Sequence, residues 1–292
     1  MSHPILWHIV GAGAIGQYFA AELSKQVHVC LHAKQHTINQ IELTDLNKHI
    51  QTIDLEQDDQ NPIQYLIICT KAYDAVQAFE TYRSRLTEHC QIVCLFNGLG
   101  PQFEIQTQHT APVWLASTTV GARKISSNHV LHTGQGITIF GQTTQIPKPS
   151  NIINTLEKMH WCHSTNILHV LYLKLAINSL INPLTVIFNC NNGKLLNIKK
   201  ATNIMMALAL EIESICKKVN IELSSAFILQ NTYQVIEKTA QNYSSMHQDV
   251  ANKRRTEIQL INGYWQNLGQ THNINVEQNT LMMDKIMSFT VK

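Results

Sequence analysis

Three polar side chains stand four residues apart in one of the most apolar stretches of the chain, between residues 171 and 188. If this stretch is a helix, Lys174, Asn178 and Asn182 form a single line along it. Unpaired amides and an ammonium group are costly to bury among leucine and isoleucine side chains, which favours a line that faces a cleft. A solvent-exposed helix face is the alternative interpretation.

A lysine in such a cleft can act as an acid near neutral pH. Desolvation lowers the pKa of an ammonium group, so the proton of Lys174 becomes transferable. Reduction of a ketone needs a proton donor, because hydride delivered to the carbon leaves negative charge on the oxygen. The amide and hydroxyl groups of Asn178, Asn182 and Ser245 would suit a carboxylate on the same substrate.

A glycine-rich turn near the start of the chain indicates nucleotide binding. It follows an apolar run, opens a helical pattern, and consists of Gly11, Ala12, Gly13, Ala14, Ile15 and Gly16. In such a turn the first glycine permits a tight bend, the second lets a pyrophosphate approach the backbone, and the third lets helix pack on strand. An ordinary loop is the alternative, but the strand before and the helix after favour a dinucleotide site.

The residues after the second expected strand bear on the choice of nucleotide. A unit specific for NAD places Asp or Glu there, roughly twenty residues after the glycines, to hold the ribose hydroxyl. Residues 31–36 contain no acid, and Lys34 suits the 2′-phosphate of NADP(H) instead. The alternative is a solvated basic strand end, since lysine holds phosphate less rigidly than an arginine fork does.

The elements expected to position these residues divide the chain in two. Strands are predicted at 5–10, 27–31, 65–69 and 91–96, with helices at 15–25 and 75–86, which is typical of a parallel sheet. Lys71 and Asn97 follow the third and fourth strands, at the carboxyl ends where ligands of such sheets bind. Strands at 113–120, 129–133 and 137–140 are expected to form hairpins that close the sheet.

Beyond this sheet the pattern becomes helical. Pro147 and Pro149 break the chain before a helix at 151–159, and a short strand is expected at 167–170. Further helices are predicted at 201–219, 225–238 and 248–268. We therefore expect an α/β fold with a Rossmann-type NADP-binding domain at 1–168 and an all-α substrate and catalytic domain at 169–292.

The composition narrows the classes of partner. With 292 residues and 44% hydrophobic residues, the chain can bury two cores, and a net charge of +2 gives no reason to expect nucleic acid or an anionic membrane. Seven cysteines without a Cys-x-x-Cys pair suit buried thiols in a reducing cytoplasm. The histidines are scattered singly, so no metal site is expected, and polar residues within 171–188 argue against a membrane span.

Several motifs together resemble the ketopantoate reductase (2-dehydropantoate 2-reductase) family, in order from about residue 5 to residue 280. Besides the glycine turn they are Thr70-Lys71-Ala72, Phe96-Asn97-Gly98-Leu99-Gly100, Lys174-Leu175-Ala176-Ile177-Asn178, Ile181-Asn182-Pro183-Leu184-Thr185, Asn242-Tyr243-Ser244-Ser245-Met246 and Thr256-Glu257-Ile258. The resemblance implies a C-terminal helical domain like that of 6-phosphogluconate dehydrogenase. It also implies NADPH-dependent reduction of 2-dehydropantoate to (R)-pantoate, a step of pantothenate and coenzyme A synthesis.

The resemblance also implies a role for each matching residue. Lys174 is the proton donor, and Glu257 supports catalysis where the nicotinamide ribose and the substrate meet. The substrate is held by the residues that match Asn178, Asn182, Asn192, Asn242 and Ser245. The cofactor is contacted by those that match Lys71, Asn97 and Ala122, and the family often carries arginine where Lys34 stands.

Two other functions stay open at this stage. One is reduction of another branched 2-oxo acid, which depends on the shape of the substrate pocket. The other is a non-catalytic NADP(H)-sensing protein on the same fold, which the presence of both Lys174 and Glu257 argues against. A small 2-oxo acid is the expected partner, and the chain is expected to be a monomer or a homodimer.

Overall fold

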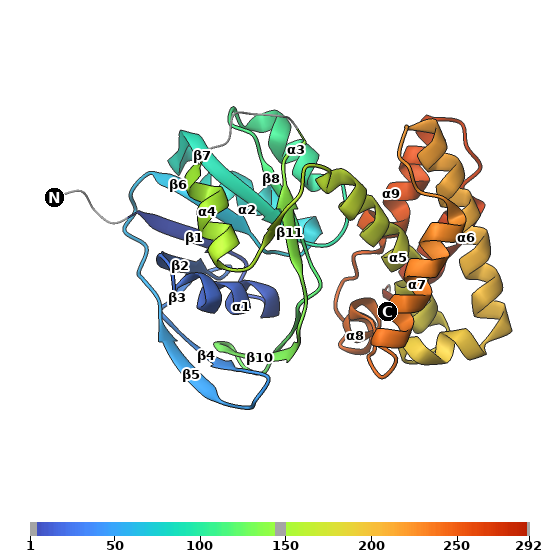
Figure 1. The fold of residues 1–292 in the computed structure, drawn as a ribbon, viewed down its shortest axis with the longest axis horizontal. Helices are drawn as coiled ribbons and strands as arrows, with labels where there is room; N and C mark the ends of the chain where they lie inside the picture. Colours follow the sequence, from blue (N-terminus) through green and yellow to red (C-terminus); the bar gives the residue numbers. More distant parts are fainter. Residues whose placement is uncertain (1–4, 144–149, 291–292) are drawn as a thin grey trace. The chain divides into compact units, whose positions relative to one another are not determined.

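The computed structural model describes residues 5–143 and 150–290, and the chain divides into two compact units (Figure 1). The first comprises Met1–Phe96 and Pro101–Leu168, and the second comprises Asn97–Gly100 and His169–Lys292. Pro147 and Pro149, expected to break the chain, lie outside the described residues. The short segment from 97 to 100 therefore belongs to the second unit although both of its neighbours belong to the first.

The first unit contains an eight-stranded sheet in the order β12-β11-β8-β7-β6-β1-β2-β3. Five neighbouring strands are parallel: β2 (His28–His32), β1 (Leu6–Val10), β6 (Ile63–Ile68), β7 (Leu86–Leu95) and β8 (Trp114–Thr118). The helices α1 (Ala14–Leu23), α2 (Ala75–Tyr82) and α3 (Pro101–Gln108) connect these strands. This strand order and these helical connections are those of a dinucleotide-binding fold, as the sequence predicts.

Shorter strands extend this sheet at both sides. β3 (Thr37–Ile38) is antiparallel to β2 at one side. At the other side β11 (Thr138–Gly141) is antiparallel to β8, and β12 (Cys162–His163) is parallel to β11. α4 (Ser150–Lys158) precedes β12, and the 3-10 turns η1 (Ala72–Asp74) and η2 (Arg83–Arg85) flank α2.

A second, four-stranded sheet lies in the same unit and was not predicted. Its order is β5-β4-β10-β9, from β5 (Ile50–Asp54), β4 (Gln40–Thr44), β10 (His129–Gly134) and β9 (Gly121–Lys124). The expectation that segment 129–133 helps to close the main sheet is wrong: β9 and β10 do form a hairpin, but β10 pairs in parallel with β4. Local sequence cannot reveal this partner, because β4 is more than 80 residues away in the chain.

The described part of the second unit is helical. It contains α5 (Ile167–Ile187), η3 (Asn192–Asn197), α6 (Lys199–Lys218), α7 (Ser225–Lys238), α8 (Ser245–Ala251), α9 (Ile258–Thr271) and α10 (Glu277–Thr290). Its core includes the fully buried Trp265 on α9 and Leu180 on α5. α5 is long and apolar enough to cross a membrane, but most of its apolar window is buried, as in the core helix of a globular unit.

Two further predictions about helices are wrong. The strand expected at 167–170 is the first turn of α5, because the β-branched Ile167 and Val170 precede a long apolar helix that overrides their strand preference. The single helix expected at 248–268 is two helices. Lys253 has a φ of 54°, in the left-handed region, so the chain leaves α8 and starts α9 after Glu257.

Candidate active site

The three glycines of the turn after β1 have different steric surroundings. A Cβ on Gly11, whose φ is 113°, would lie 2.7 Å from the backbone of Thr70, and a Cβ on Gly16 would overlap the carbonyl oxygen of Gly11. A Cβ on Gly13 would meet no atom within 4 Å. The first and third glycines therefore serve the packing of strand and helix. The second leaves open space beside the backbone, which a phosphate group requires.

Hydrogen bonds hold this turn in one orientation. The carbonyl oxygen of Ala12 accepts from Gln17 Nε2 at 3.1 Å and from Lys124 Nζ at 2.9 Å. Gln17 also donates to the carbonyl of Ser127 at 2.9 Å, so the loop between β9 and β10 is tied to the turn. Gly13, the N-cap of α1, offers no side-chain cap to the helix, and the first turn of α1 contains no acid. The N–H groups there suit an anionic ligand.

The other cofactor residues predicted from the sequence are divided between the two units. Lys34 is exposed two residues after β2, Lys71 is half-buried between β6 and η1, and Ala122 is half-buried on β9. Asn97 belongs to the second unit, where the Leu99 N–H of the same segment donates to the carbonyl of Leu260 at 3.1 Å. Gln17 and Lys124 contact the turn but were not predicted. The signal available for Gln17 was a polar side chain among the apolar residues of the expected helix.

The second unit places Lys174 and Glu257 within electrostatic range of each other. Lys174 is half-buried on α5, and burial lowers the pKa of its ammonium group from 10.5 to about 8, while the Glu257 carboxylate opposes part of that shift. Glu257 is 5% exposed and immediately precedes α9. An ammonium group with a pKa near 8 is still mostly protonated at pH 7 and gives up its proton readily.

One buried and one part-buried contact join α9, which follows Glu257, to α5, which carries Lys174. Asn262 Nδ2 donates to the carbonyl of Ser179 at 3.2 Å, and the hydroxyls of Tyr172 and Tyr264 lie 2.9 Å apart. Neither pair was predicted, because both join residues more than 80 positions apart and the sequence carries no local signal of such pairing.

Four of the predicted substrate residues, Asn182, Asn192, Asn242 and Ser245, lie on or next to segments that hydrogen bonds join near the end of α5 and the start of α8, whereas Asn178 lies nearer the middle of α5. Asn182 and Asn192 are each 6% exposed, while Asn178 is half-buried. The Asn192 N–H donates to the carbonyl of Asn242 at 2.9 Å. Asn242 and Ser245 are exposed.

Two neighbouring hydroxyls join these elements. Thr185 Oγ1 donates to the carbonyl of Asn182 and lies 2.6 Å from Ser244 Oγ, which precedes Ser245. Asn192 Nδ2 donates to Thr239 at 2.8 Å, while its buried Oδ1 has no hydrogen-bond partner within the ranges 5–143 and 150–290. A buried amide oxygen of this kind is available to a ligand.

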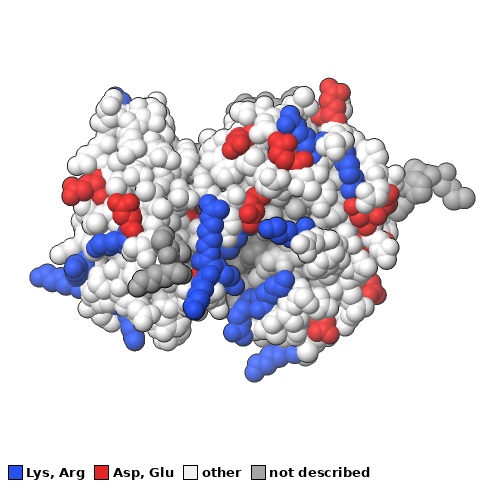
Figure 2. All heavy atoms as spheres, turned by 180° about the vertical axis from the view of Figure 1, so that it is seen from behind, with Lys and Arg blue, Asp and Glu red and all other residues white. Residues whose placement is uncertain are grey.

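Surface charge and cavities do not indicate a different location for the active site. Figure 2 shows both basic and acidic side chains on the face that it draws. A hollow of about 590 Å³ in the first unit is lined by residues of β6, β7 and α4, among them Tyr65 and Asn151. It contains none of the predicted site residues, so its chemistry gives no reason to place the reaction there.

The fold and these residues define a class of protein with a dinucleotide-binding α/β unit and a helical unit that carries a desolvated lysine. The chain belongs to the ketopantoate reductase family. The family model for ketopantoate reductase PanE/ApbA matches residues 7–145, and the model for the C-terminal part of the same family matches residues 166–289. The resemblance and the fold class predicted from the sequence are thereby confirmed.

Curated relatives agree with this assignment, and solved structures share the fold. The chain is 31% identical over 298 residues to the 2-dehydropantoate 2-reductase of Vibrio cholerae, covering 95% of both chains. It is also 31% identical over 289 residues to that of Shigella flexneri. A ketopantoate reductase of this family from Ralstonia eutropha has the same fold, with a TM-score of 0.88, 20% identity and 98% of both chains covered. D-mandelate dehydrogenase with NADH and anilino(oxo)acetate has a TM-score of 0.86 at 21% identity, with 98% of each chain covered.

Proposed function

We propose that this chain catalyses the NADPH-dependent reduction of 2-dehydropantoate to (R)-pantoate. The named relatives support the substrate, since those from Vibrio cholerae and Shigella flexneri are 2-dehydropantoate 2-reductases. The observation that carries the proposal is the desolvated ammonium of Lys174, whose pKa of about 8 suits proton donation to a carbonyl oxygen.

The first unit supplies the cofactor site in this proposal, with the Rossmann-type domain spanning residues 1–168. The open space at Gly13, the uncapped start of α1 and the engaged carbonyl of Ala12 fit a pyrophosphate. Bound NADPH supplies the hydride. The full set of proposed cofactor residues is Gly11, Ala12, Gly13, Ala14, Ile15, Gly16, Lys34, Lys71, Asn97, Ala122 and Glu257.

Preference for NADPH over NADH rests on the residues that follow β2. Lys34 is exposed there, and residues 31–36 offer no carboxylate to hold a ribose hydroxyl. A lysine attracts a 2′-phosphate as a point charge, whereas an acid would repel it.

The helical domain, 169–292 in this proposal, supplies the acid and the substrate ligands. Lys174 Nζ donates a proton to the carbonyl oxygen as hydride reaches the adjacent carbon, so no net charge develops on the product hydroxyl. Glu257 holds that ammonium protonated by its charge. Amide and hydroxyl side chains of this domain orient the carboxylate and the hydroxyl of the substrate. These side chains belong to Asn178, Asn182, Asn192, Asn242 and Ser245.

A steady-state assay of NADPH oxidation with 2-dehydropantoate tests the proposal. Replacement of Lys174 by alanine is expected to lower kcat by roughly a hundredfold or more, because a general acid is removed. An unchanged kcat would end the role of Lys174. A much higher kcat/KM for a different branched 2-oxo acid would identify that acid as the substrate in place of 2-dehydropantoate. NADPH binding without turnover of any 2-oxo acid would indicate a sensing protein.

The cellular compartment and the oligomeric state of the enzyme are part of the same proposal. Of the seven cysteines, all free, only Cys162 is exposed, which suits a reducing cytoplasm. The proposed partner is the small 2-oxo acid alone, bound by a monomer or a homodimer. A structural neighbour from Staphylococcus aureus is described as a dimeric ketopantoate reductase. Gel filtration with light scattering distinguishes the two states.

A further inference from the structure

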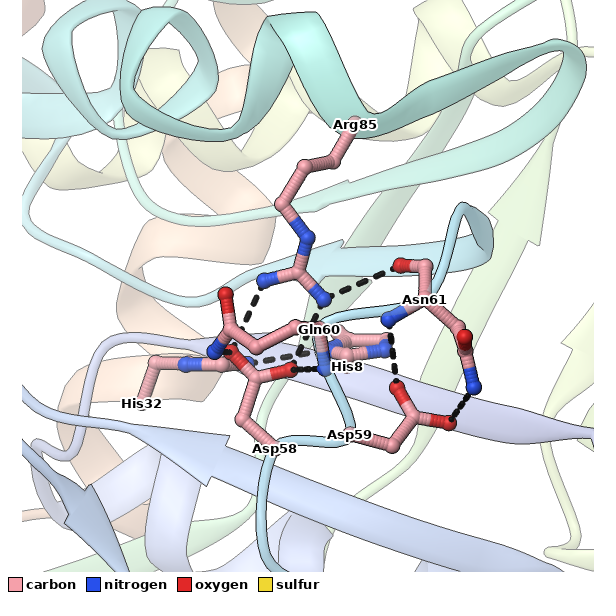
Figure 3. A network of polar contacts seen from close by, with 7 residues as sticks. All are labelled: His8, His32, Asp58, Asp59, Gln60, Asn61 and Arg85. Atoms are coloured by element: carbon pink, nitrogen blue, oxygen red, sulfur yellow. Dashed lines mark hydrogen bonds and ion pairs between the residues drawn. The ribbon is translucent and has the colours of Figure 1, made fainter.

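A polar network in the first unit, which includes the buried His8 and His32, takes no part in the proposed reaction (Figure 3). His8 lies on β1, and Cys30 and His32 lie on β2. Within the parallel pair, His8 is the register partner of Cys30, and His32 follows two residues later, so all three side chains share one face of the sheet. The exposed fractions are 2% for His8, 0% for Cys30 and 3% for His32.

The three side chains converge on one point. His8 Nδ1 and His32 Nε2 lie 2.9 Å apart, and one ligand atom from each of His8, Cys30 and His32 lies within 4.8 Å of the other two. Two nitrogens bound to one tetrahedral zinc ion are about 3.3 Å apart, and a nitrogen and a sulfur about 3.5 Å apart. His8 and His32 share a hydrogen bond in this arrangement, so a zinc ion would replace that bond and turn the two rings toward itself.

The surrounding charges favour a cation at this point. Asp58 and Asp59 each place a carboxylate oxygen within 4.8 Å of a ring nitrogen of His8. Arg85 is the nearby positive group, and its guanidinium is already engaged with both oxygens of Asp58, each at 2.8 Å.

We propose that His8, Cys30 and His32 form a binding site for one zinc ion, with water in the fourth coordination position. The borderline-soft Zn²⁺ binds imidazole nitrogen and thiolate sulfur together, whereas Mg²⁺ and Ca²⁺ require oxygen ligands. Binding releases the thiol proton of Cys30 to solvent and involves no redox change. The proposal departs from the expectation of no metal site, which rested on spacing along the chain, because these ligands come from two neighbouring strands and not from one segment.

Position in the fold indicates what the ion would do. The carbonyl of His32 accepts the N–H of Gly11 at 3.0 Å, so the residue that ends β2 also holds the first glycine of the turn. A metal bound to the side chain of His32 would fix β1 to β2 immediately beside the cofactor turn. The ion is therefore structural in this proposal, and its test does not depend on enzyme activity.

Cobalt is the probe for the site, because Co²⁺ replaces Zn²⁺ and reports its ligands by absorption. Untagged full-length protein, stripped with a chelator and kept reduced, is titrated with Co²⁺ alone. We expect one equivalent to bind and to produce the near-ultraviolet charge-transfer band of a cobalt–thiolate bond. Cys30→Ser is expected to abolish the band, and His32→Asn to weaken binding at least tenfold. The band should persist in Cys90→Ser, which changes a buried thiol on β7.

A second measurement keeps the test decisive if a variant folds poorly. Added Zn²⁺ should raise the thermal midpoint of the unaltered protein and of Cys90→Ser but not that of Cys30→Ser, whose folding is checked by circular dichroism without metal. Absence of the thiolate band in the unaltered protein would overturn the proposal. A band that survives in Cys30→Ser would also overturn it, because the cobalt would then be held by other thiols.

Discussion

The alkaline limb of the pH–rate profile is the sharpest expectation from the active-site geometry. Lys174 must be protonated to donate, and burial lowers its pKa to about 8. The kcat/KM for reduction should therefore be constant below about pH 7.5 and fall about tenfold per pH unit above about 8.5. The shift from 10.5 to about 8 corresponds to about 3 kcal/mol, at about 1.4 kcal/mol per pH unit.

Removal of the Glu257 charge should move this limb in a known direction. The carboxylate raises the pKa of Lys174, so Glu257→Gln lowers that pKa further and shifts the limb toward neutral pH. Glu222→Gln is the matched control, because Glu222 is an exposed acid of the same unit. At a pH below the new limb the variant keeps a protonated lysine, so its remaining loss of kcat reports any other role of Glu257.

The assay is NADPH oxidation with 2-dehydropantoate, followed from about pH 6 to about pH 10 in buffers of constant ionic strength. The Glu222→Gln limb should coincide with that of the unaltered enzyme. An apparent pKa close to the usual value of a lysine would refute the assignment of Lys174 as a desolvated acid. A limb that stays in place in Glu257→Gln would refute the electrostatic link between the two residues.

Three other expectations follow from the site. Lys174→Met should raise the free energy of unfolding at pH 7 by up to about 3 kcal/mol in denaturant titration, while it abolishes turnover. This gain should disappear as the pH rises from about 8 to 10.5. Over that range the lysine of the unaltered protein is already neutral when folded but still protonated when unfolded, so the unaltered protein becomes more stable. Gly16→Ala should destabilise the fold, whereas Gly13→Ala should leave the melting temperature unchanged and weaken NADPH binding in fluorescence titration; equal effects would contradict the different surroundings of the two glycines. Lys34→Ala should raise KM for NADPH but not for NADH, and Lys25→Ala, at another exposed lysine, should raise neither.

The parts of the molecule that sequence predicts well are local ones. The glycine turn, its strand and its helix occupy consecutive residues, and the steric demand at Gly16 is set by the carbonyl of Gly11 in the same turn. The line from Lys174 through Asn182 follows from helix periodicity alone, and α5 contains all of it. Spacing therefore predicts where these residues lie on their elements, and the lowered pKa of Lys174 agrees in direction with the sequence prediction.

Pairings between distant segments escape the same reasoning. β4 alternates in burial, with Ile41 and Leu43 inward, yet its partner β10 could not be read from that pattern. Glu257 precedes α9 after a break in the helix that includes Lys253 in a left-handed conformation, which its residue type does not favour. His8 and Cys30 become neighbours through strand register, which no local motif encodes.

The short segment 97–100 has a consequence for how the protein can be dissected. The chain passes from one unit to the other after Phe96, back after Gly100 and across again after Leu168. Gly98, with a φ of 83°, and Leu99 both lie against the backbone of Leu260, which stands in the last third of the chain. A truncation at residue 168 would thus leave this segment without its support. The two units are interlaced in sequence, and gene fragments cut at a single point would not reproduce either of them.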